Sequence, residues 1–487
     1  MAPIFLFLGV QTEKGAFFCG KTETERLNRH LKPISNLPEN KMGTRPVFPL
    51  LLSMAFPAML SMFIQSMYNV VDSMFVARIG EDALTAVSLA FPIQNLLLAV
   101  AVGTGVGVNS YISRKLGEGN QPEADSAVSH GLLLALLSSA AFVILGLLFI
   151  RPFFSLYTDS ETVLALGVGY TQIVTCACFG MQLHIVIEKV LQATGNMVYP
   201  MVMQAAGAIV NIILDPILIF GLFGAPALGV NGAAIATVIG QLASMGLSFW
   251  FLLSREHAVA LRLRGFRFHA RTVRDVYAVG FPSIVMNSLG SVLVMGLNGI
   301  LVGFSNMAVS LFGVYFKLQS FVFMPVSGLI QGAMPIMGYN YGAGNRKRLQ
   351  DALSASLLVA ALIMAAGAAV FLLFPAGLLL WFDASKEMLA AGVPALRIIC
   401  LSYLPAAVSF IISTLFQAIG RGFYSLLISL LRQLLLTLLF AFLLAPALGL
   451  TGVWISFPLA EAIAAGASLF LLARIRREVP LLRREKA

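Results

Sequence analysis

Twelve apolar segments, each bounded by charged residues, glycine or proline, follow one another along almost the whole chain. Each holds about 18 or more mostly apolar residues, which as a helix is long enough to cross a ~30 Å hydrocarbon core. The short alternating segments of a membrane β-barrel are not found. The pattern therefore predicts an all-α membrane protein with twelve transmembrane helices, near 48–73, 84–110, 128–150, 163–189, 198–222, 230–254, 276–302, 308–336, 352–374, 388–416, 424–446 and 451–473.

The composition supports this prediction and narrows the function. Hydrophobic residues make up 59% of the chain and charged residues 11%, and the mean hydropathy is +0.88. Soluble domains have about 25% charged residues, so this chain cannot cover a surface that faces water. No spacing of His, Asp, Glu or Cys suggests a catalytic constellation, and the cysteines follow no disulfide or metal-binding pattern. We expect a transport protein that is not an enzyme and needs no cofactor.

The basic residues predict the orientation in the membrane. The net charge is +10, but most Lys and Arg residues fall in loops on one side, above all in 255–274 and in the tail 474–487. The opposite side holds only Arg78, Arg151 and Lys386. Short loops rich in Lys and Arg stay in the cytoplasm. The charge therefore predicts no nucleic-acid partner, but a multi-pass protein of the plasma membrane, in a bacterium the inner membrane, with both termini cytoplasmic.

The two halves of the chain repeat each other. LGEGN at 116–120 recurs as YGAGN at 341–345, and the same offset of 225 residues links Pro57 to Pro282. Repeats of six spans have parallel orientation, and their pseudo-symmetry axis runs along the membrane normal. Two such bundles facing each other enclose a central cavity that rocking opens to either side in turn, which is the architecture of alternating access.

These patterns divide the chain into five parts. We predict a disordered cytoplasmic tail at 1–45, an N-terminal six-helix bundle at 46–254, a cytoplasmic linker at 255–275, a C-terminal six-helix bundle at 276–473 and a basic cytoplasmic tail at 474–487.

A few ionisable residues lie at membrane depth, where each is a functional hypothesis because its insertion is costly. Asp72 in the first span and Asp215 in the fifth both fall in the outer half, given a rise of ~1.5 Å per residue. Asn211 lies one helical turn before Asp215, and Thr237 in the sixth span reaches a similar level. Such a group could bind a proton, and the same oxygens could hold Na⁺ as a metal site. The alternative for either aspartate is that it only caps a helix.

Further polar residues are candidates for a substrate cavity. Asn298 and Gln319 would line its far wall, although an interhelical hydrogen bond is an equally good use for either. An intrahelical pair with the adjacent Lys189 is the alternative for Glu188. Pro57 lies inside the first span and is a candidate hinge, with a static kink as the alternative. The candidate lining residues are Gln65, Tyr68, Asn69, Glu188, Asn298 and Gln319.

Several motifs together resemble the multidrug and toxic compound extrusion (MATE) family over about residues 46–475. They are FPAMLSMFIQSMYNVVDSMFVARIGEDALTA, LGEGN, EKVLQATGN, NIILDP and GVNGAAIAT. The resemblance implies a cation-coupled antiporter that exports amphipathic, often cationic drugs in exchange for H⁺ or Na⁺. Its partners would be these small molecules and the lipid bilayer, and we expect it to function as a monomer. The resemblance further implies cation coupling at Asp72, Asn211, Asp215 and Thr237 and bending at Pro57.

One alternative within the same superfamily is a flippase for a lipid-linked saccharide precursor. Such a protein would need an arginine-rich cavity for pyrophosphate and often has fourteen spans, whereas this chain offers only Arg397 and Arg432 and twelve spans. The acidic residues that some branches of the family use in the C-terminal bundle have no match here. We therefore expect coupling in the N-terminal bundle.

Overall fold

The computed structural model describes residues 40–254, 257–262, 264 and 266–479, so most of the predicted tail 1–45 lies outside the described residues. In these ranges every regular element is helical. Eleven helices are long and apolar enough to span a membrane, and a bent pair supplies a twelfth span. Two of the eleven, Lys386–Ala418 and Gly422–Leu448, contain a short 3-10 or π-helical stretch. The predicted all-α architecture with twelve spans is confirmed.

The N-terminal bundle follows the short helix α2 (Lys41–Thr44). It contains α3 (Val47–Ala77), α4 (Glu81–Gly117), α5 (Gln121–Ser155), α6 (Glu161–Cys176), α7 (Phe179–Ala193), α8 (Val198–Phe220), the short turn η3 (Leu222–Gly224) and α9 (Val230–Ser254).

The C-terminal bundle repeats this arrangement. It contains α10 (Ala270–Val302), α11 (Asn306–Gly342), α12 (Arg346–Leu373), α13 (Pro375–Leu380), α14 (Lys386–Ile399), η4 (Cys400–Ser402), α15 (Tyr403–Ala418), α16 (Gly422–Ser429), the π-helical stretch η5 (Leu430–Leu436), α17 (Thr437–Leu448) and α18 (Leu450–Glu478).

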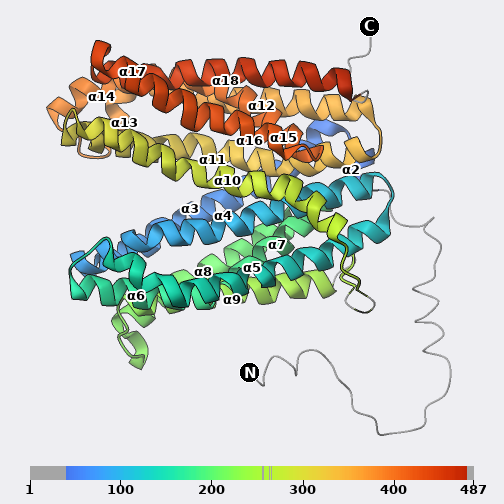
Figure 1. The fold of residues 1–487 in the computed structure, drawn as a ribbon, viewed down its shortest axis with the longest axis horizontal. Coiled ribbons are helices and arrows are strands. Elements are labelled where there is room, and N and C mark those ends of the chain that lie inside the picture. The colour runs from blue at the N-terminus through green and yellow to red at the C-terminus, as the bar shows by residue number, and fades with distance from the viewer. Residues whose placement is uncertain (1–39, 255–256, 263, 265, 480–487) are drawn as a thin grey trace. The chain divides into compact units, whose positions relative to one another are not determined.

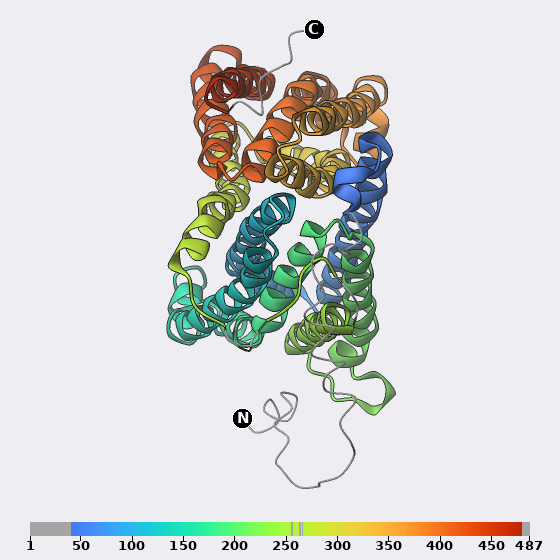
Figure 2. The same cartoon turned by 90° about the vertical axis from the view of Figure 1, so that its right-hand side faces the viewer.

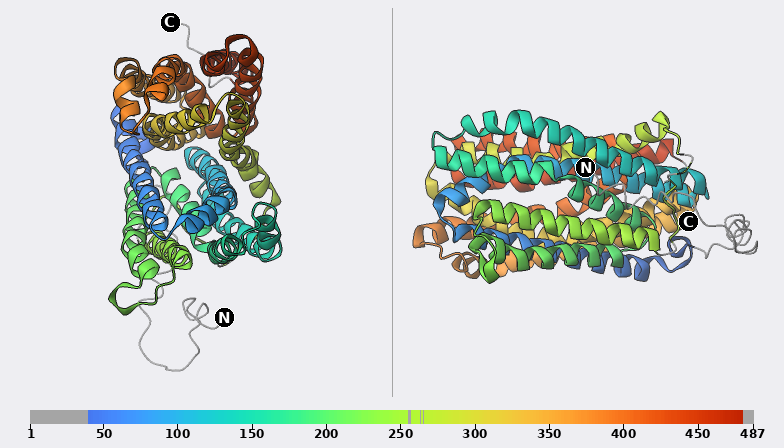
Figure 3. Two further views of the ribbon diagram at one scale, coloured as in Figure 1. Left: turned by 90° about the vertical axis from the view of Figure 1, so that its left-hand side faces the viewer. Right: turned by 90° about the horizontal axis from the view of Figure 1, so that it is seen from below.

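The first helix of each bundle lies at the boundary between the two. Helix α3 packs against α11 as well as α8, and α10 packs against α4. Seen end-on, α3 and α10 occupy opposite edges of this boundary (Figures 2 and 3). We call the end of the helices that carries residues 257–262 and 266–269 the linker end and the other the far end. Figure 1 shows the ribbons of the two bundles drawing together toward the linker end.

The repeated GN motifs explain how the bundles turn at the linker end. Gly119 (φ +72°) and Gly344 (φ +68°) adopt left-handed conformations that favour glycine and end the preceding helices. The side chains of the next residues, Asn120 and Asn345, then cap the following helices by accepting from backbone N–H groups. The same two-residue device therefore links the second and third spans of both bundles.

The predicted fourth span, 163–189, is bent in the structure. Helices α6 and α7 meet at an angle of 47°. At the break, the amides of Cys178 and Gly180 bond to carbonyls three residues earlier, at 3.3 Å and 3.2 Å. These tighter turns interrupt the α-helical ladder and redirect the axis. An apolar run cannot reveal such a break, because both segments face an apolar environment.

Described residues between 257 and 269 contact α5 at three positions, Ala260, Arg262 and His269. The buried Asp125 carboxylate pairs with Arg262 at 3.0 Å and accepts the Ala260 amide at 2.9 Å. His130 Nε2 accepts the His269 amide at 2.9 Å. The segment that the sequence marked as a linker is therefore fastened to the N-terminal bundle just before α10 begins.

Close packing at the bundle boundary yields a first prediction. A side chain at Gly107 of α4 would meet the Val276 carbonyl and the Gly280 backbone of α10. Gly107→Leu should therefore destabilise the protein by about 1–3 kcal/mol through overpacking, read as a lower melting temperature in detergent. Gly290→Leu is the matched control, because open space surrounds Gly290. Equal melting temperatures for the two variants would contradict this account.

Candidate functional site

The two aspartates singled out in the sequence meet in the N-terminal bundle. Asp72 on α3 is half-buried and Asp215 on α8 is fully buried, and their carboxyl groups lie close enough to interact electrostatically. Helices α3 and α8 pack along each other, which brings the two positions to one level. Both residues lie in the later turns of their helices and away from the N-termini, so neither is an N-cap.

Amide and hydroxyl groups surround the carboxylates. Asn211 is buried one turn before Asp215, and its amide nitrogen donates to the Asp215 carboxylate at 2.9 Å in the orientation that satisfies both neighbours. In that orientation its amide oxygen accepts from the Thr237 hydroxyl of α9 at 3.3 Å. Tyr68 lines the same small cavity as this threonine. The structure thus brings together all four residues that the sequence proposed for coupling.

This group of residues suits a small cation. Asp72 Oδ1 is buried without a hydrogen-bond partner among the described residues. A buried, unsatisfied carboxylate oxygen is costly unless a proton or cation completes its shell. Asp215 and Thr237 add further oxygen atoms, the ligand type that hard cations prefer, while the Asn211 oxygen is turned toward Thr237. The residues present therefore fit either a shared proton or an alkali cation.

A central cavity of about 450 Å³ lies between the bundles. Side chains from α3, α4, α7 and α8 form one wall, and side chains from α10, α11, α15, α16 and the π-helical stretch form the other. The lining is rich in uncharged polar groups: Ser61, Gln65, Gln204, Ser283, Asn287, Ser327, Gln331, Ser409, Ser413, Thr414, Gln417, Ser429 and Gln433. A volume in this range suits a drug-sized molecule.

A smaller cavity of about 110 Å³ adjoins the coupling residues and is lined by Tyr68, Asn211 and Thr237. Gln65 and Gln204 line both cavities. The small cavity beside the cation-binding candidates therefore shares part of its wall with the central cavity.

Three of the six residues predicted to line the substrate cavity line one of these two cavities. Gln65 and Glu188 line the central cavity, and Tyr68 lines the smaller one. The other three line neither: Asn69 is exposed on α3, and Asn298 and Gln319 are half-buried on α10 and α11. Pro57 lies inside α3, which continues unbroken through it, and its carbonyl accepts from Ser61 at 3.0 Å.

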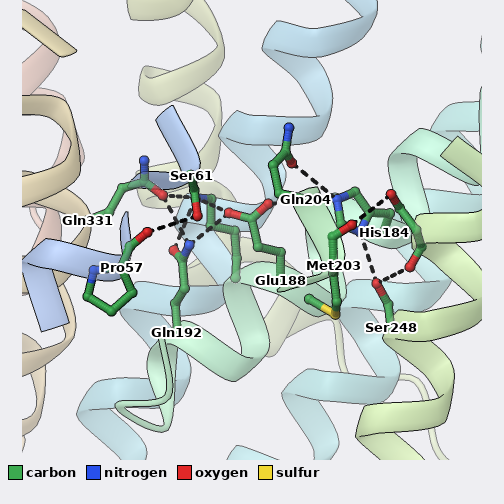
Figure 4. Close-up of polar contacts among 11 residues, drawn as sticks. Pro57, Ser61, His184, Glu188, Gln192, Met203, Gln204, Ser248 and Gln331 are labelled. Carbon is green, nitrogen blue, oxygen red and sulfur yellow. Dashed lines mark hydrogen bonds and ion pairs between the residues drawn. The ribbon is translucent and has the colours of Figure 1, made fainter. Parts of the chain in front are cut away.

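A network around Lys189 connects the bundles in the wall of the cavity, and Figure 4 shows its members Glu188, Gln192 and Gln331. The Lys189 ammonium donates to Glu188 at 3.0 Å and to Gln331 of α11 at 2.8 Å. Gln192 donates to the same Gln331 oxygen at 3.0 Å. The Glu188–Lys189 pair, the alternative considered for Glu188, is present, and Glu188 also lines the cavity. The contact of Lys189 with the other bundle was not predicted from the sequence.

His184 takes part in a neighbouring group within the N-terminal bundle, and its Nε2 lies 4.0 Å from Glu188 of the Lys189 network (Figure 4). Its Nδ1 lies 2.9 Å from the Ser248 hydroxyl, and its Nε2 lies 3.5 Å from Gln204 Oε1. Because Gln204 also lines the central cavity, this group supports one side chain of the cavity wall.

The C-terminal bundle contributes one ionic pair to this region. Arg432 lines the cavity and lies 3.4 Å from Glu461 of α18, and its guanidinium stacks on the Phe410 ring at 4.1 Å. Arg397, the other arginine considered for a flippase, instead donates to the Leu372 carbonyl at 3.3 Å and is not a lining residue.

Curated relatives of the chain are membrane transporters. It is 28% identical over 430 residues to the FAD transporter of Shewanella oneidensis, covering 88% of this chain and 95% of that one. It is 26% identical over 435 residues to the multidrug export protein MepA of Staphylococcus haemolyticus, covering 89% and 95%.

Solved structures match the fold as well. An outward-facing multidrug resistance MATE transporter of the MOP superfamily aligns with a TM-score of 0.85 and 26% identity, covering 92% of this chain and 99% of that one. A MOP superfamily transporter from Pyrococcus furiosus aligns with a TM-score of 0.84 and 26% identity, covering 92% and 100%.

The MatE family model matches the chain twice, at residues 57–217 and 282–443, once in each bundle. The two matches correspond to the internal repeat found in the sequence. With this repeat, the two facing bundles and the transporter relatives, the chain belongs to the MATE family of multidrug efflux transporters.

Proposed function

We propose that this protein is a cation-coupled antiporter that exports amphipathic organic compounds, often cationic drugs, by alternating access. H⁺ or Na⁺ would bind at Asp72 and Asp215, and the exported compound would bind in the central cavity. The observation that carries the proposal is the shared wall: Gln65 and Gln204 border both cavities, so a change at the coupling residues alters the space that the compound occupies.

The coupling step follows from electrostatics. With a proton or Na⁺ bound, the negative charge of the paired carboxylates is largely compensated, and α3 and α8 can stay packed. Without it, two adjacent carboxylates in a low dielectric repel each other strongly. Helix α3 carries Asp72 toward one end and the lining residues Ser61 and Gln65 toward its middle. A movement of α3 therefore acts on both sites.

Pro57 is the proposed hinge for that movement. Proline cannot donate to the carbonyl one turn earlier, so the helix is weakest there. MATE structures with 26–27% sequence identity to this chain have been solved in a bent and a straight conformation. In this chain α3 is continuous, and bending at Pro57 during the cycle remains a prediction.

The orientation is also part of the proposal. The positive-inside pattern assigns the linker end to the cytoplasm of a plasma membrane, in a bacterium the inner membrane. Close contacts between α4 and α10 and the Lys189–Gln331 bond join the bundles toward this end. The structure would then represent the outward-facing state, which is the state named for one of its structural relatives.

Purified protein in liposomes tests the proposal directly. We expect uptake of ethidium into inside-acidic or Na⁺-loaded vesicles, with one of the two gradients sufficient. Dissipating that gradient with an ionophore should stop uptake, and liposomes without protein give the baseline. Uptake of equal rate with and without either gradient would contradict coupling.

The flippase alternative receives less support. A pyrophosphate-binding cavity would need several arginines, and Arg432 is the only arginine among the residues that line the central cavity.

A further inference from the structure

The charged side chains that line the central cavity differ in how many of their hydrogen-bond donors have partners. Three charged side chains line it: Glu188, Lys189 and Arg432. Lys189 has only three N–H donors, and they are directed at Glu188, Gln192 and Gln331 at 2.8 to 3.1 Å. All three donors of Lys189 are therefore used within this network in the cavity wall.

Arg432 differs because most of its donors are unused. The side chain is 7% exposed, yet it lines the cavity. Its only ionic contact among the described residues joins Nε to Glu461 at 3.4 Å, and Nε forms no well-aligned hydrogen bond. A guanidinium has five N–H donors arranged to match the oxygens of a carboxylate or phosphate. A buried guanidinium without hydrogen bonds is costly, so a ligand that supplies acceptor oxygens is favoured.

The surroundings hold Arg432 ready for such a ligand. Phe410 stacks on the guanidinium at 4.1 Å and also lines the cavity. Stacking restricts the guanidinium without using its N–H donors. Gln433, Ser429 and Thr414 lie in the same wall and offer neutral hydrogen-bonding groups beside it. This part of the cavity therefore combines a cation, an aromatic ring and polar side chains.

The backbone at this point is also unusual. Leu430–Leu436 forms a π-helical stretch, and the Thr437 hydroxyl donates to the Arg432 carbonyl at 2.7 Å. Short π-helical insertions are frequent at functional sites. Here the stretch carries the adjacent residues Arg432 and Gln433, both of which line the cavity.

We infer that Arg432 anchors an acidic oxygen group of the transported compound, so that, among aromatic amphipathic compounds, those bearing a carboxylate or phosphate, zwitterions included, bind more tightly than matched compounds without one. The ring of the compound would lie against Phe410, and the acidic group would take the free N–H donors of Arg432. Glu461 does not line the cavity, and its carboxylate competes with the acidic group of the substrate for the Arg432 guanidinium. This inference rests on the proposed function only in taking the cavity as the substrate site.

Two matched pairs of fluorescent compounds test it. Riboflavin 5′-phosphate and riboflavin differ only in a phosphate, whereas rhodamine 110 and its methyl ester, rhodamine 123, differ only in a free carboxylate. Binding to the purified full chain in detergent is measured by fluorescence anisotropy at low salt. We expect the acidic member of at least one pair to bind about tenfold more tightly, as a charge-assisted hydrogen bond gives. Which pair shows the difference tells whether the site prefers a phosphate or a carboxylate.

Variants assign the preference to Arg432. Arg432→Gln should remove it, whereas Arg397→Gln, an arginine change in the same bundle away from the cavity, should keep it. Glu461→Gln removes the competing carboxylate and should strengthen the preference about threefold or more, since neighbouring charges compete for the same donors. This gain-of-affinity result would be informative even if Arg432→Gln folds poorly, and Arg432→Lys should give an intermediate preference.

The inference is overturned if the wild type prefers the acidic member of neither pair, or if Arg432→Gln retains the preference. It is also overturned if Glu461→Gln leaves the preference unchanged. The binding measurement needs no ion gradient. A clear preference without gradient-driven uptake would therefore reject the proposed antiport alone, and uptake without a preference would reject the arginine anchor alone.

Discussion

Asp215→Asn should abolish gradient-driven efflux of ethidium, while the amount of protein in the membrane stays unchanged. Asn has nearly the same shape as Asp and can still hydrogen-bond with Asn211, so the fold at α8 should survive. It cannot gain or lose a proton and carries no charge for Na⁺. Since Asp215 is fully buried against Asp72, no water-exposed acid can replace it. Efflux should fall to the level of cells that lack the protein.

The measurement follows dye efflux from energised cells, with membrane levels checked by immunoblot. Asp82→Asn is the matched control, because Asp82 lies exposed in the first turn of α4 and takes no part in the coupling group. Asp72→Asn should lower efflux in the same direction. Wild-type efflux by Asp215→Asn would show that coupling resides elsewhere. If efflux is lost as expected, binding of the dye to the purified variant separates lost coupling from lost substrate binding.

The meeting of Asp72 and Asp215 could be anticipated from the sequence for a simple reason. Helical rise is constant, so counting residues from a known membrane face gives depth. A charged residue within an apolar run is conspicuous, because it is costly there. The Gly-Asn motifs were detectable for a similar reason, since Gly119 and Gly344 each need a conformation that few other residues adopt.

The cavity walls were harder to predict. In a membrane both the lipid-facing and the buried face of a helix are apolar, so periodicity does not show which face looks inward. Gln65 and Asn69 lie one turn apart on α3, yet the first lines the cavity and the second is exposed. Gln331 could not be matched to Lys189, because their contact depends on how the two bundles meet. The bend between α6 and α7 was hidden by the same uniform apolarity.

Lys189→Met should open the linker end. The change removes the bond from the N-terminal bundle to Gln331 and leaves the Glu188 carboxylate without its cation. A hydrogen bond to a charged group contributes about 1.5–3 kcal/mol, and 1.4 kcal/mol is a tenfold change in population. The population ratio of states in which the bundles separate at this end to states in which they are joined should therefore rise by about tenfold or more. Drug efflux should slow, because the state that releases the compound outward becomes less populated.

Spin labels can follow this movement at Val198 and Phe423, two exposed positions at the linker end, one in each bundle, separated by the repeat offset of 225 residues. In a background without the four native cysteines, double electron–electron resonance should show a longer distance population in Lys189→Met than in wild type. Gln331→Leu removes only the acceptor and should give a smaller shift in the same direction.

Lys115→Met separates this effect from general loss of charge at the linker end. Lys115 pairs with Glu118 and Glu123 at 2.8 Å, but all three residues belong to the N-terminal bundle. Its removal should leave the distance between Val198 and Phe423 unchanged. If Lys189→Met also leaves that distance unchanged, the bond to Gln331 does not hold the bundles together. The contacts of α4 with α10 around Gly107 would then be sufficient to close the linker end.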